Sequence, residues 1–337
     1  MQALLKPISE LADYSAMKDA LKKNKTIFLN GPVDSEKLHI IYGLADGFKI
    51  KLIITYSEIR VREIVEDAKL YDRNLYVYPA RDLIFYQADI HGNQLTKERI
   101  RACKRIMEGK PVTLVTTFDA LMTPQPPLSV LKDSMISVKR DEDINLAGFA
   151  EKLVTLGYEK VYQVDSPGQF SVRGGIVDIY DLTEDNPVRM ELWGDTVDSI
   201  RSFDVLSQRS IEELQSFCIY PATEIILTPA QMSEGLTKIE KEAVKQEELL
   251  RSDFKTEEAH RVKQQFKELK ERLTEFNDYT NLESYVNYFY KDTASLADLI
   301  KGESHIFFLD EPARIKEHAS ATETEFKESM SHRLEKG

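Results

Sequence analysis

The stretch from residue 25 to 117 alternates short apolar runs with segments of helical spacing, and this alternation constrains the fold more than any other feature of the chain. We predict strands over residues 26–30, 49–55, 74–78 and 111–116, and helices running through Leu44, over 58–70 and over 95–107. An order of strand, helix and strand produces parallel strands covered by helices. This part of the chain is therefore predicted to be an α/β domain.

A sequence similar to a phosphate-binding loop follows the first predicted strand. The template is a glycine, four variable residues, and then Gly-Lys followed by Ser or Thr. Gly31 and Lys37 match it, but Glu36 replaces the second glycine and Leu38 replaces the hydroxyl residue. A glutamate puts negative charge beside a polyanion, and a leucine cannot ligate Mg²⁺. We expect this degenerate loop to have lost nucleotide binding.

The acidic residues that an ATPase site would need come much later in the chain. Residues 306–309 form one more apolar strand, and Asp310 and Glu311 follow it directly. Without a phosphate cradle these two carboxylates are interpreted as a helix cap or a packing remnant, with Arg314 close enough to neutralise them.

Three prolines, at positions 124, 126 and 127, mark a domain boundary. We predict a degenerate P-loop α/β domain over 1–127 and a small α+β domain over 128–218, in which residues 146–156 form a helix capped by Gly157. The remaining part, 219–337, is predicted to be helical and to complete the α/β module. Its first helix begins at Thr228, where Pro229 and Gln231 produce a capping-box pattern.

The only tryptophan of the chain lies on the polar side of a predicted hairpin. From residue 188 to 193 the sequence alternates, so Val188, Met190 and Leu192 face the core while Arg189 and Trp193 lie side by side on the opposite face. The alternation of an earlier strand puts Arg173 on its polar side as well, and Gly174 and Gly175 are interpreted as a bulge that aims it. Tryptophan and arginine are the residues enriched at binding hot spots. The alternative is that Trp193 lies under a neighbouring loop.

These segments also carry a family resemblance. The runs VRGGIVDIY, PVRMELWGD and VDSIRSFDVLSQRS resemble domain 2 of UvrB-like excision-repair proteins, and most closely that of the transcription-repair coupling factors (Mfd). The resemblance covers most of the chain. It implies a RecA-like, UvrB-like α/β fold with decayed motor motifs, into which the small domain is inserted.

The resemblance also implies a partner. In that family this domain recruits UvrA, through two arginines sixteen positions apart and an aromatic residue four positions beyond the second, which match Arg173, Arg189 and Trp193. It implies further that full-length relatives bind RNA polymerase and translocate on double-stranded DNA through regions outside these residues. The long DNA-probing hairpin of UvrB has no counterpart here, so Phe85 and Tyr86 are interpreted as core or loop-anchoring aromatics.

Composition narrows the function further. The formal net charge is −12, and residues 128–218 alone hold nine Lys or Arg against seventeen Asp or Glu. An acidic surface disfavours the DNA backbone, so exposed arginines in an acidic domain point to carboxylates of a protein partner. Two distant cysteines and six scattered histidines indicate neither a disulfide nor a metal site, and we expect no cofactor. No apolar run could span a membrane, so a cytoplasmic monomer is expected.

The reading we favour is a non-catalytic adaptor module that recruits UvrA to stalled RNA polymerase in transcription-coupled nucleotide excision repair. Two alternatives stay open. One is an ATP-dependent damage-verifying protein of the UvrB kind, which detectable affinity for Mg-ATP would support. The other is a DNA-binding module that grips the duplex through the basic helix around residues 97–105, which steep salt dependence would support.

Overall fold

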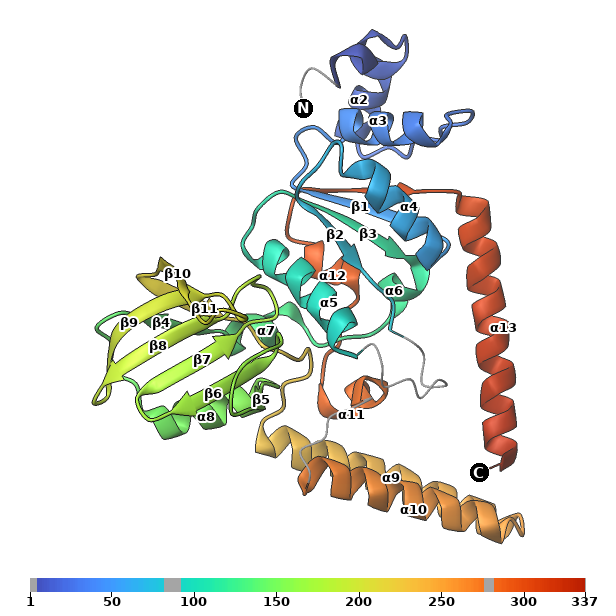
Figure 1. The fold of residues 1–337 in the computed structure, drawn as a ribbon. Coiled ribbons are helices and arrows are strands. Elements are labelled where there is room, and N and C mark those ends of the chain that lie inside the picture. Colours follow the sequence, from blue (N-terminus) through green and yellow to red (C-terminus); the bar gives the residue numbers. More distant parts are fainter. Residues whose placement is uncertain (1–4, 82–91, 276–281, 337) are drawn as a thin grey trace. The chain divides into compact units, whose positions relative to one another are not determined.

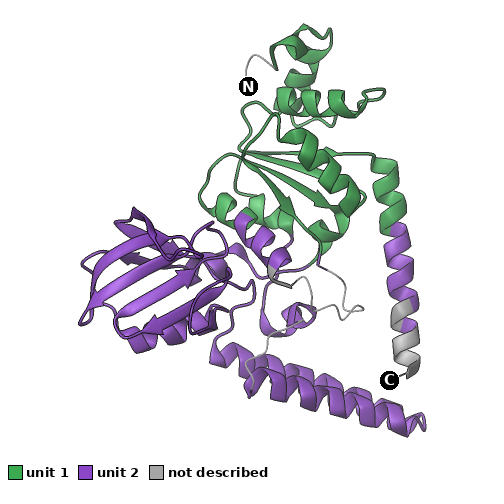
Figure 2. Ribbon diagram, in the orientation of Figure 1, with its two compact units in different colours: residues 1–80, 102–123, 296–319 green, residues 81–101, 124–295, 320–337 purple. Residues whose placement is uncertain are grey.

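The computed structural model describes residues 5–81, 92–275 and 282–336. By compactness the chain divides into two units (Figure 2). Unit 1 consists of residues 1–80, 102–123 and 296–319, and unit 2 of residues 81–101, 124–295 and 320–337. The division into three parts with boundaries after residues 127 and 218 stays a prediction.

Unit 1 is built on a parallel four-stranded sheet in the order β12-β1-β3-β2 (Figure 1). Its strands are β1 (Ile50–Thr55), β2 (Leu75–Tyr78), β3 (Val112–Thr117) and β12 (His305–Leu309). Its helices are η1 (Lys6–Glu10), α2 (Tyr14–Lys22), α3 (Asp34–Leu44), α4 (Glu58–Ala68), α6 (Phe118–Met122) and α12 (Leu296–Ile300). Two further helices, α5 (Gly92–Met107) and α13 (Pro312–Lys336), contribute residues to both units. The predicted α/β architecture is confirmed.

Helices α3 and α4 pack against the same sheet. Leu38 and Ile41 of α3 and Val61 and Ile64 of α4 form one buried cluster with Ile53 of β1. These apolar residues recur at helical spacing in the sequence, and burial of each large aliphatic side chain stabilises the fold by about 1.5–3 kcal/mol. The packing fixes the first turn of α3 beside the carboxyl end of β12.

The first predicted strand is the one part of this alternation that is wrong. Residues 26–30 form no strand, and Phe28 and Leu29 are 82% and 44% exposed. An apolar run becomes a strand only where a neighbouring strand supplies backbone hydrogen bonds. Among the described residues the edge strand β12 pairs with β1 alone, so the run from 26 to 30 has no ladder to join.

Unit 2 contains a six-stranded sheet in the order β10-β9-β8-β7-β6-β5 and a two-stranded ribbon β11-β4. The strands are β4 (Ile136–Lys139), β5 (Glu159–Lys160), β6 (Gln169–Arg173), β7 (Ile176–Tyr180), β8 (Val188–Trp193), β9 (Thr196–Phe203), β10 (Ser210–Glu213) and β11 (Ser216–Ile219). The helices are α7 (Leu128–Ser134), α8 (Leu146–Thr155), α9 (Pro229–Ser252), α10 (Thr256–Thr274), η2 (Leu282–Tyr285) and α11 (Val286–Phe289). The hairpins and α8 were predicted, whereas α7 was not.

One face of the six-stranded sheet is covered within unit 2. Phe149 and Leu153 of α8 pack against Phe170, Val177 and Met190 of the sheet, and the β4-β11 ribbon completes this core (Figure 1). We call the opposite side of β6 to β9 the outer face; Ser171, Arg173, Asp178, Arg189 and Trp193 belong to it by strand alternation.

Helices α9 and α10 form the predicted helical pair. Leu236 and Ile239 of α9 are buried together with Leu269 and Leu273 of α10. The predicted capping box is present, because the Thr228 hydroxyl accepts a hydrogen bond from the backbone N–H of Gln231 at 3.2 Å. The start of α9 could therefore be predicted from the sequence.

Candidate partner-binding site and the loop before helix α3

A two-residue turn brings Arg173 to the end of β6. Arg173 pairs with Ile176, so Gly174 and Gly175 form the tight connection between β6 and β7 and not the predicted bulge. Gly174 has a φ of 60°, which favours glycine, and a Cβ on Gly175 would lie 2.8 Å from the Leu192 carbonyl oxygen. The two glycines are needed for the turn itself and for the close approach of β8.

Strand β8 has the predicted orientation. Val188 and Met190 are buried and Leu192 is half-buried against the same core, while Arg189 lies on the outer face. Trp193 pairs with Thr196 across a two-residue turn, and Gly194 in that turn has a φ of 65°. The predicted hairpin and its facing are thus confirmed.

Arg189 is far less exposed than its place on the outer face suggests. Only 15% of its side chain is accessible. Its Nε donates to Asp178 Oδ1 at 2.6 Å, and one terminal nitrogen donates to Asp178 Oδ2 and to Gln208 Oε1, both at 2.9 Å. The guanidinium also lies 4.4 Å from the centre of the Phe203 ring. Hydrogen bonding to Asp178 raises the pKa of Arg189 above its ordinary value, against the effect of burial.

Arg173 binds the same carboxylate from the neighbouring strand. One of its terminal nitrogens donates to Asp178 Oδ2 at 2.6 Å. The other donates to the Tyr162 carbonyl at 2.9 Å and to the Ser171 hydroxyl at 3.2 Å. The Asp178 side chain is 1% accessible and the Arg173 side chain 31%. The structure therefore brings both predicted arginines together on one buried acid.

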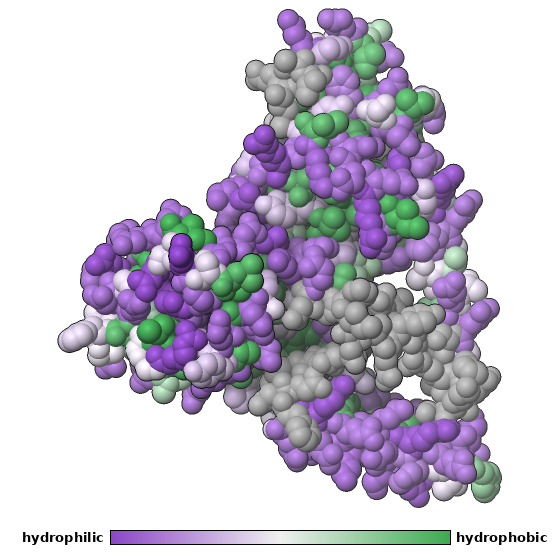
Figure 3. Space-filling model, in the orientation of Figure 1, coloured by the Kyte–Doolittle hydropathy of each residue, from purple (hydrophilic) through white to green (hydrophobic). Residues whose placement is uncertain are grey.

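Trp193 ends β8 on the same outer face and is 85% exposed. The alternative in which it lies under a loop is wrong. Two other large side chains of the same domain are similarly open, Tyr162 at 86% and Leu206 at 94%. In the space-filling view, apolar residues interrupt the otherwise hydrophilic surface of this domain (Figure 3). Exposed aromatic side chains near arginines are typical of protein interfaces.

Sequence reasoning missed three residues of the cluster, namely Asp178, Phe203 and Gln208. Asp178 could have been found, because it alternates with the apolar residues of β7 and lies opposite Arg189 in the β7-β8 register. Phe203 ends β9, so its position depends on the register of that strand, and Gln208 left no signal because it lies in the loop after β9.

The loop before α3 uses its own Glu36 to begin the helix. Glu36 Oε2 accepts a hydrogen bond from the backbone N–H of Val33 at 3.1 Å, so a loop amide that could contact a phosphate is already bound by a carboxylate. Gly31 keeps a glycine-type φ of 101°. Leu38 is 4% exposed and packs in the core between α3 and α4.

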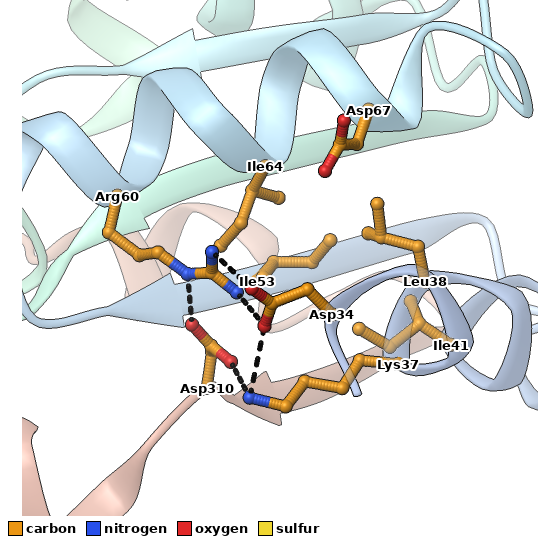
Figure 4. A pocket seen from close by; sticks show the side chains of 9 residues that line it. All are labelled: Asp34, Lys37, Leu38, Ile41, Ile53, Arg60, Ile64, Asp67 and Asp310. Atoms are coloured by element: carbon orange, nitrogen blue, oxygen red, sulfur yellow. Dashed lines mark hydrogen bonds and ion pairs between the residues drawn. The ribbon is translucent and has the colours of Figure 1, made fainter. Parts of the chain in front are cut away.

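Lys37 and Arg60 neutralise the acidic residues beside this loop (Figure 4). Lys37 Nζ lies 3.1 Å from Asp310 Oδ1 and 2.6 Å from Glu311 Oε1. Arg60 Nε lies 2.9 Å from Asp310 Oδ2, and its NH2 lies 2.7 Å from Asp34 Oδ1. Arg314, which the sequence suggested for this role, instead donates to the Tyr56 hydroxyl at 2.9 Å.

The ion pairs make this region a poor binding site for an anion such as a phosphate. Burial alone would lower the pKa of Lys37, but hydrogen bonds from its ammonium to Glu311 and Asp310 raise it above the ordinary value. The hydrogen bond from Arg60 lowers the pKa of Asp34. The small pocket at this point is lined by Asp34, Lys37, Leu38, Ile41, Ile53, Arg60, Ile64, Asp67 and Asp310 (Figure 4). Its two cations are both bound to carboxylates.

In residues 5–81, 92–275 and 282–336 no three His, Cys, Asp or Glu side chains gather as metal ligands would. No helix in these ranges has the length and apolar character needed to cross a membrane. Phe85 and Tyr86 lie outside the described residues.

Comparison with known proteins identifies the class of the chain. Residues 136–225, which contain the outer face, match the UvrB interaction domain family. The chain is 35% identical over 287 residues to the transcription-repair-coupling factor of Bacillus subtilis, covering 85% of this chain and 24% of that protein. It is 30% identical to the factor of the same name in Staphylococcus epidermidis, covering 86% and 24%. It is 32% identical to UvrABC system protein B of Thermosipho africanus, covering 76% and 39%.

The fold and the matched domain together define a UvrB-like module of DNA repair proteins. Within that class, the chain is homologous to part of the transcription-repair-coupling factors. It spans about a quarter of the length of these curated relatives. The resemblance stated from the sequence motifs is confirmed.

Proposed function

We propose that this chain is a non-catalytic adaptor that recruits UvrA in transcription-coupled nucleotide excision repair. The observation that carries the proposal is the 85% exposed Trp193 in a domain of the UvrB interaction family, on the sheet face where Arg173 and Arg189 converge. In this proposal the three side chains form the contact with UvrA.

The chemistry of the outer face suits a protein partner with acidic groups. An exposed indole buries a large apolar area on binding, and arginine forms directional bonds to carboxylates. The two arginines stand in a segment, 128–218, that is otherwise strongly acidic. They are thus a local exception that would attract a carboxylate and orient it.

The proposal includes the absence of ATP hydrolysis in this chain. Glu36 binds a loop amide, Leu38 is buried in place of a Mg²⁺ ligand, and Lys37 is held by Asp310 and Glu311. A nucleotide phosphate would have to displace these carboxylates from the lysine. The ATP-driven DNA translocation and the binding of RNA polymerase that we infer for the full-length protein belong to regions outside these residues. We place the protein in the cytoplasm, as a monomer.

The alternative of a DNA-binding module finds less support. The basic residues of α5 that have described contacts bind protein groups: Arg99 binds the buried Glu224 at 2.9 Å, and Arg101 lies 3.0 Å from Asp185. Farther along the same helix, Arg105 donates to the Tyr76 hydroxyl at 2.7 Å. Such residues would have to give up these contacts to bind phosphates.

Calorimetric titration of the chain with its cognate UvrA tests the proposal. The triple variant Arg173→Ala, Arg189→Ala, Trp193→Ala should lose binding while retaining the far-ultraviolet circular dichroism of the unmodified chain. Phe254→Ala is the matched control, since it removes an aromatic side chain that is 94% exposed but belongs to the turn after α9. Titration with Mg-ATP should give no heat. No binding of UvrA by the unmodified chain would overturn the adaptor proposal, and saturable binding of Mg-ATP would overturn its non-catalytic part.

A further inference from the structure

A single buried carboxylate lies beneath both arginines of the outer face. Asp178 occupies the middle of β7, with Ser171 of β6 and Arg189 of β8 as its direct cross-strand neighbours. Both of its oxygens are used: Oδ1 accepts from Arg189, and Oδ2 accepts from Arg189 and from Arg173. Arg173 reaches it diagonally from the end of β6.

The arrangement leaves one positive charge in excess. Two guanidinium groups share one carboxylate, whereas the neighbouring pair of Glu191 and Arg201 is neutral by itself. The buried Glu224 also binds two arginines, but there Glu283 pairs with Arg81 and balances the second charge. The excess positive charge lies in a segment, 128–218, whose overall balance is −8.

The arginines also keep unused donors in fixed positions. Within the described residues, Arg189 NH1 has no hydrogen-bond partner, because the contacts to Asp178 and Gln208 use Nε and NH2. Arg173 uses NH1 and NH2, and its Nε has no partner in the same ranges. An incoming carboxylate could therefore bind without displacing Asp178.

We propose that Asp178 is the positioning residue of the outer face, and that it presents Arg173 and Arg189 as one preformed receptor for a carboxylate of UvrA. This inference rests on the proposed function. Long arginine side chains lose conformational freedom when they bind, and holding them in place beforehand removes much of that cost. Asp178 does not touch the partner and acts through the two guanidinium groups.

A double-mutant cycle tests this role. Asp178→Asn should weaken UvrA binding by about tenfold or more, as expected when a charged partner of a binding arginine is lost. In the Arg173→Ala, Arg189→Ala background the same change should cause no further loss. Asp198→Asn is the matched control, because it makes the same chemical change at an exposed position of β9. Unchanged binding of Asp178→Asn, or losses that simply add, would overturn the proposal.

A second variant tests the same role in case Asp178→Asn does not fold. Arg189→Lys retains the positive charge but cannot make the forked contact with Asp178. It should weaken binding about as much as Arg189→Ala does. Binding equal to that of the unmodified chain would show that charge alone suffices, and would overturn the positioning role.

A measurement on the free chain separates this inference from the proposed function. The Arg189 Nε–H resonance should be detectable and slow to exchange in nuclear magnetic resonance spectra, and it should be lost in Asp178→Asn. An unprotected Nε–H in the unmodified chain would overturn the positioning role even if UvrA binds. A protected Nε–H with no UvrA binding would reject the proposed function and the carboxylate receptor, while retaining the contact with Asp178.

Discussion

Arg189 and Arg99 show how single charged residues are placed in unit 2. Each lies on a buried carboxylate that also binds a second arginine: Asp178 binds Arg173 and Glu224 binds Arg81. Arg99 is completely buried and also donates to Gln125 at 2.9 Å. Buried charges are tolerated only when paired in this way, so loss of one member leaves the others uncompensated.

Glu224→Gln should lower the stability of unit 2. Removing the charge leaves two arginines without their buried partner, and we expect a loss of about 3 kcal/mol at neutral pH in urea unfolding. Glu234→Gln is the control, because this glutamate belongs to an exposed pair with Lys238. It should change stability by less than about 0.5 kcal/mol.

The same variant should also alter acid unfolding. Burial alone would raise the pKa of Glu224, but Arg81 and Arg99 lower it below the ordinary value of 4.5. The unfolded chain then binds the proton more tightly than the folded chain, so the stabilisation is complete above pH 4.5 and is lost as pH falls through the lowered pKa. In Glu224→Gln the folding stability should therefore fall less steeply as the pH is lowered. If the variant and the unmodified chain lost stability equally at low pH, the attribution of this pH dependence to Glu224 would be wrong.

Helix boundaries show what local signals decide at the level of elements. The Thr228 hydroxyl and the Gln231 side chain satisfy backbone groups at the start of α9, and Gly157 ends α8 with a φ of 85°. Both were predicted from residue type and spacing alone. The prediction of a strand over residues 26–30 is wrong because the hydrogen bonds of a strand depend on a neighbouring strand.

Thr228→Ala should destabilise α9 by about 1 kcal/mol, since it removes the acceptor for the Gln231 amide. Thr237→Ala is the matched change, at an exposed position inside the same helix. It should be neutral or slightly stabilising, because alanine has the higher helix propensity. Equal losses in thermal or urea unfolding for the two variants would argue against the cap as the cause.

For the molecule as a whole, the net charge of −12 is the quantity that opposes direct binding to DNA. Counterion release at basic surfaces supplies most of the non-specific affinity for DNA, and an acidic protein gains little of it. The adaptor proposal needs no direct contact with the duplex, whereas the DNA-binding alternative depends on one.

We therefore expect no saturable binding of a short labelled duplex at micromolar protein, even at about 50 mM salt, in fluorescence anisotropy. The triple variant of Arg173, Arg189 and Trp193 serves as a control. Tight binding with a steep salt slope would favour the alternative. If the triple variant then lost that binding, the outer face would be the DNA site.

The sequence by itself determined the α/β alternation, the start of α9, the end of α8 and the core side of β8, because residue type and spacing act locally in each case. Only the tertiary structure decided which groups meet. Asp178 holds two arginines from neighbouring strands, and Arg60, not Arg314, pairs with Asp310. The Asp178 contacts are close in sequence but depend on strand register, and the contact of Arg60 with Asp310 joins residues 250 positions apart through helix and sheet packing.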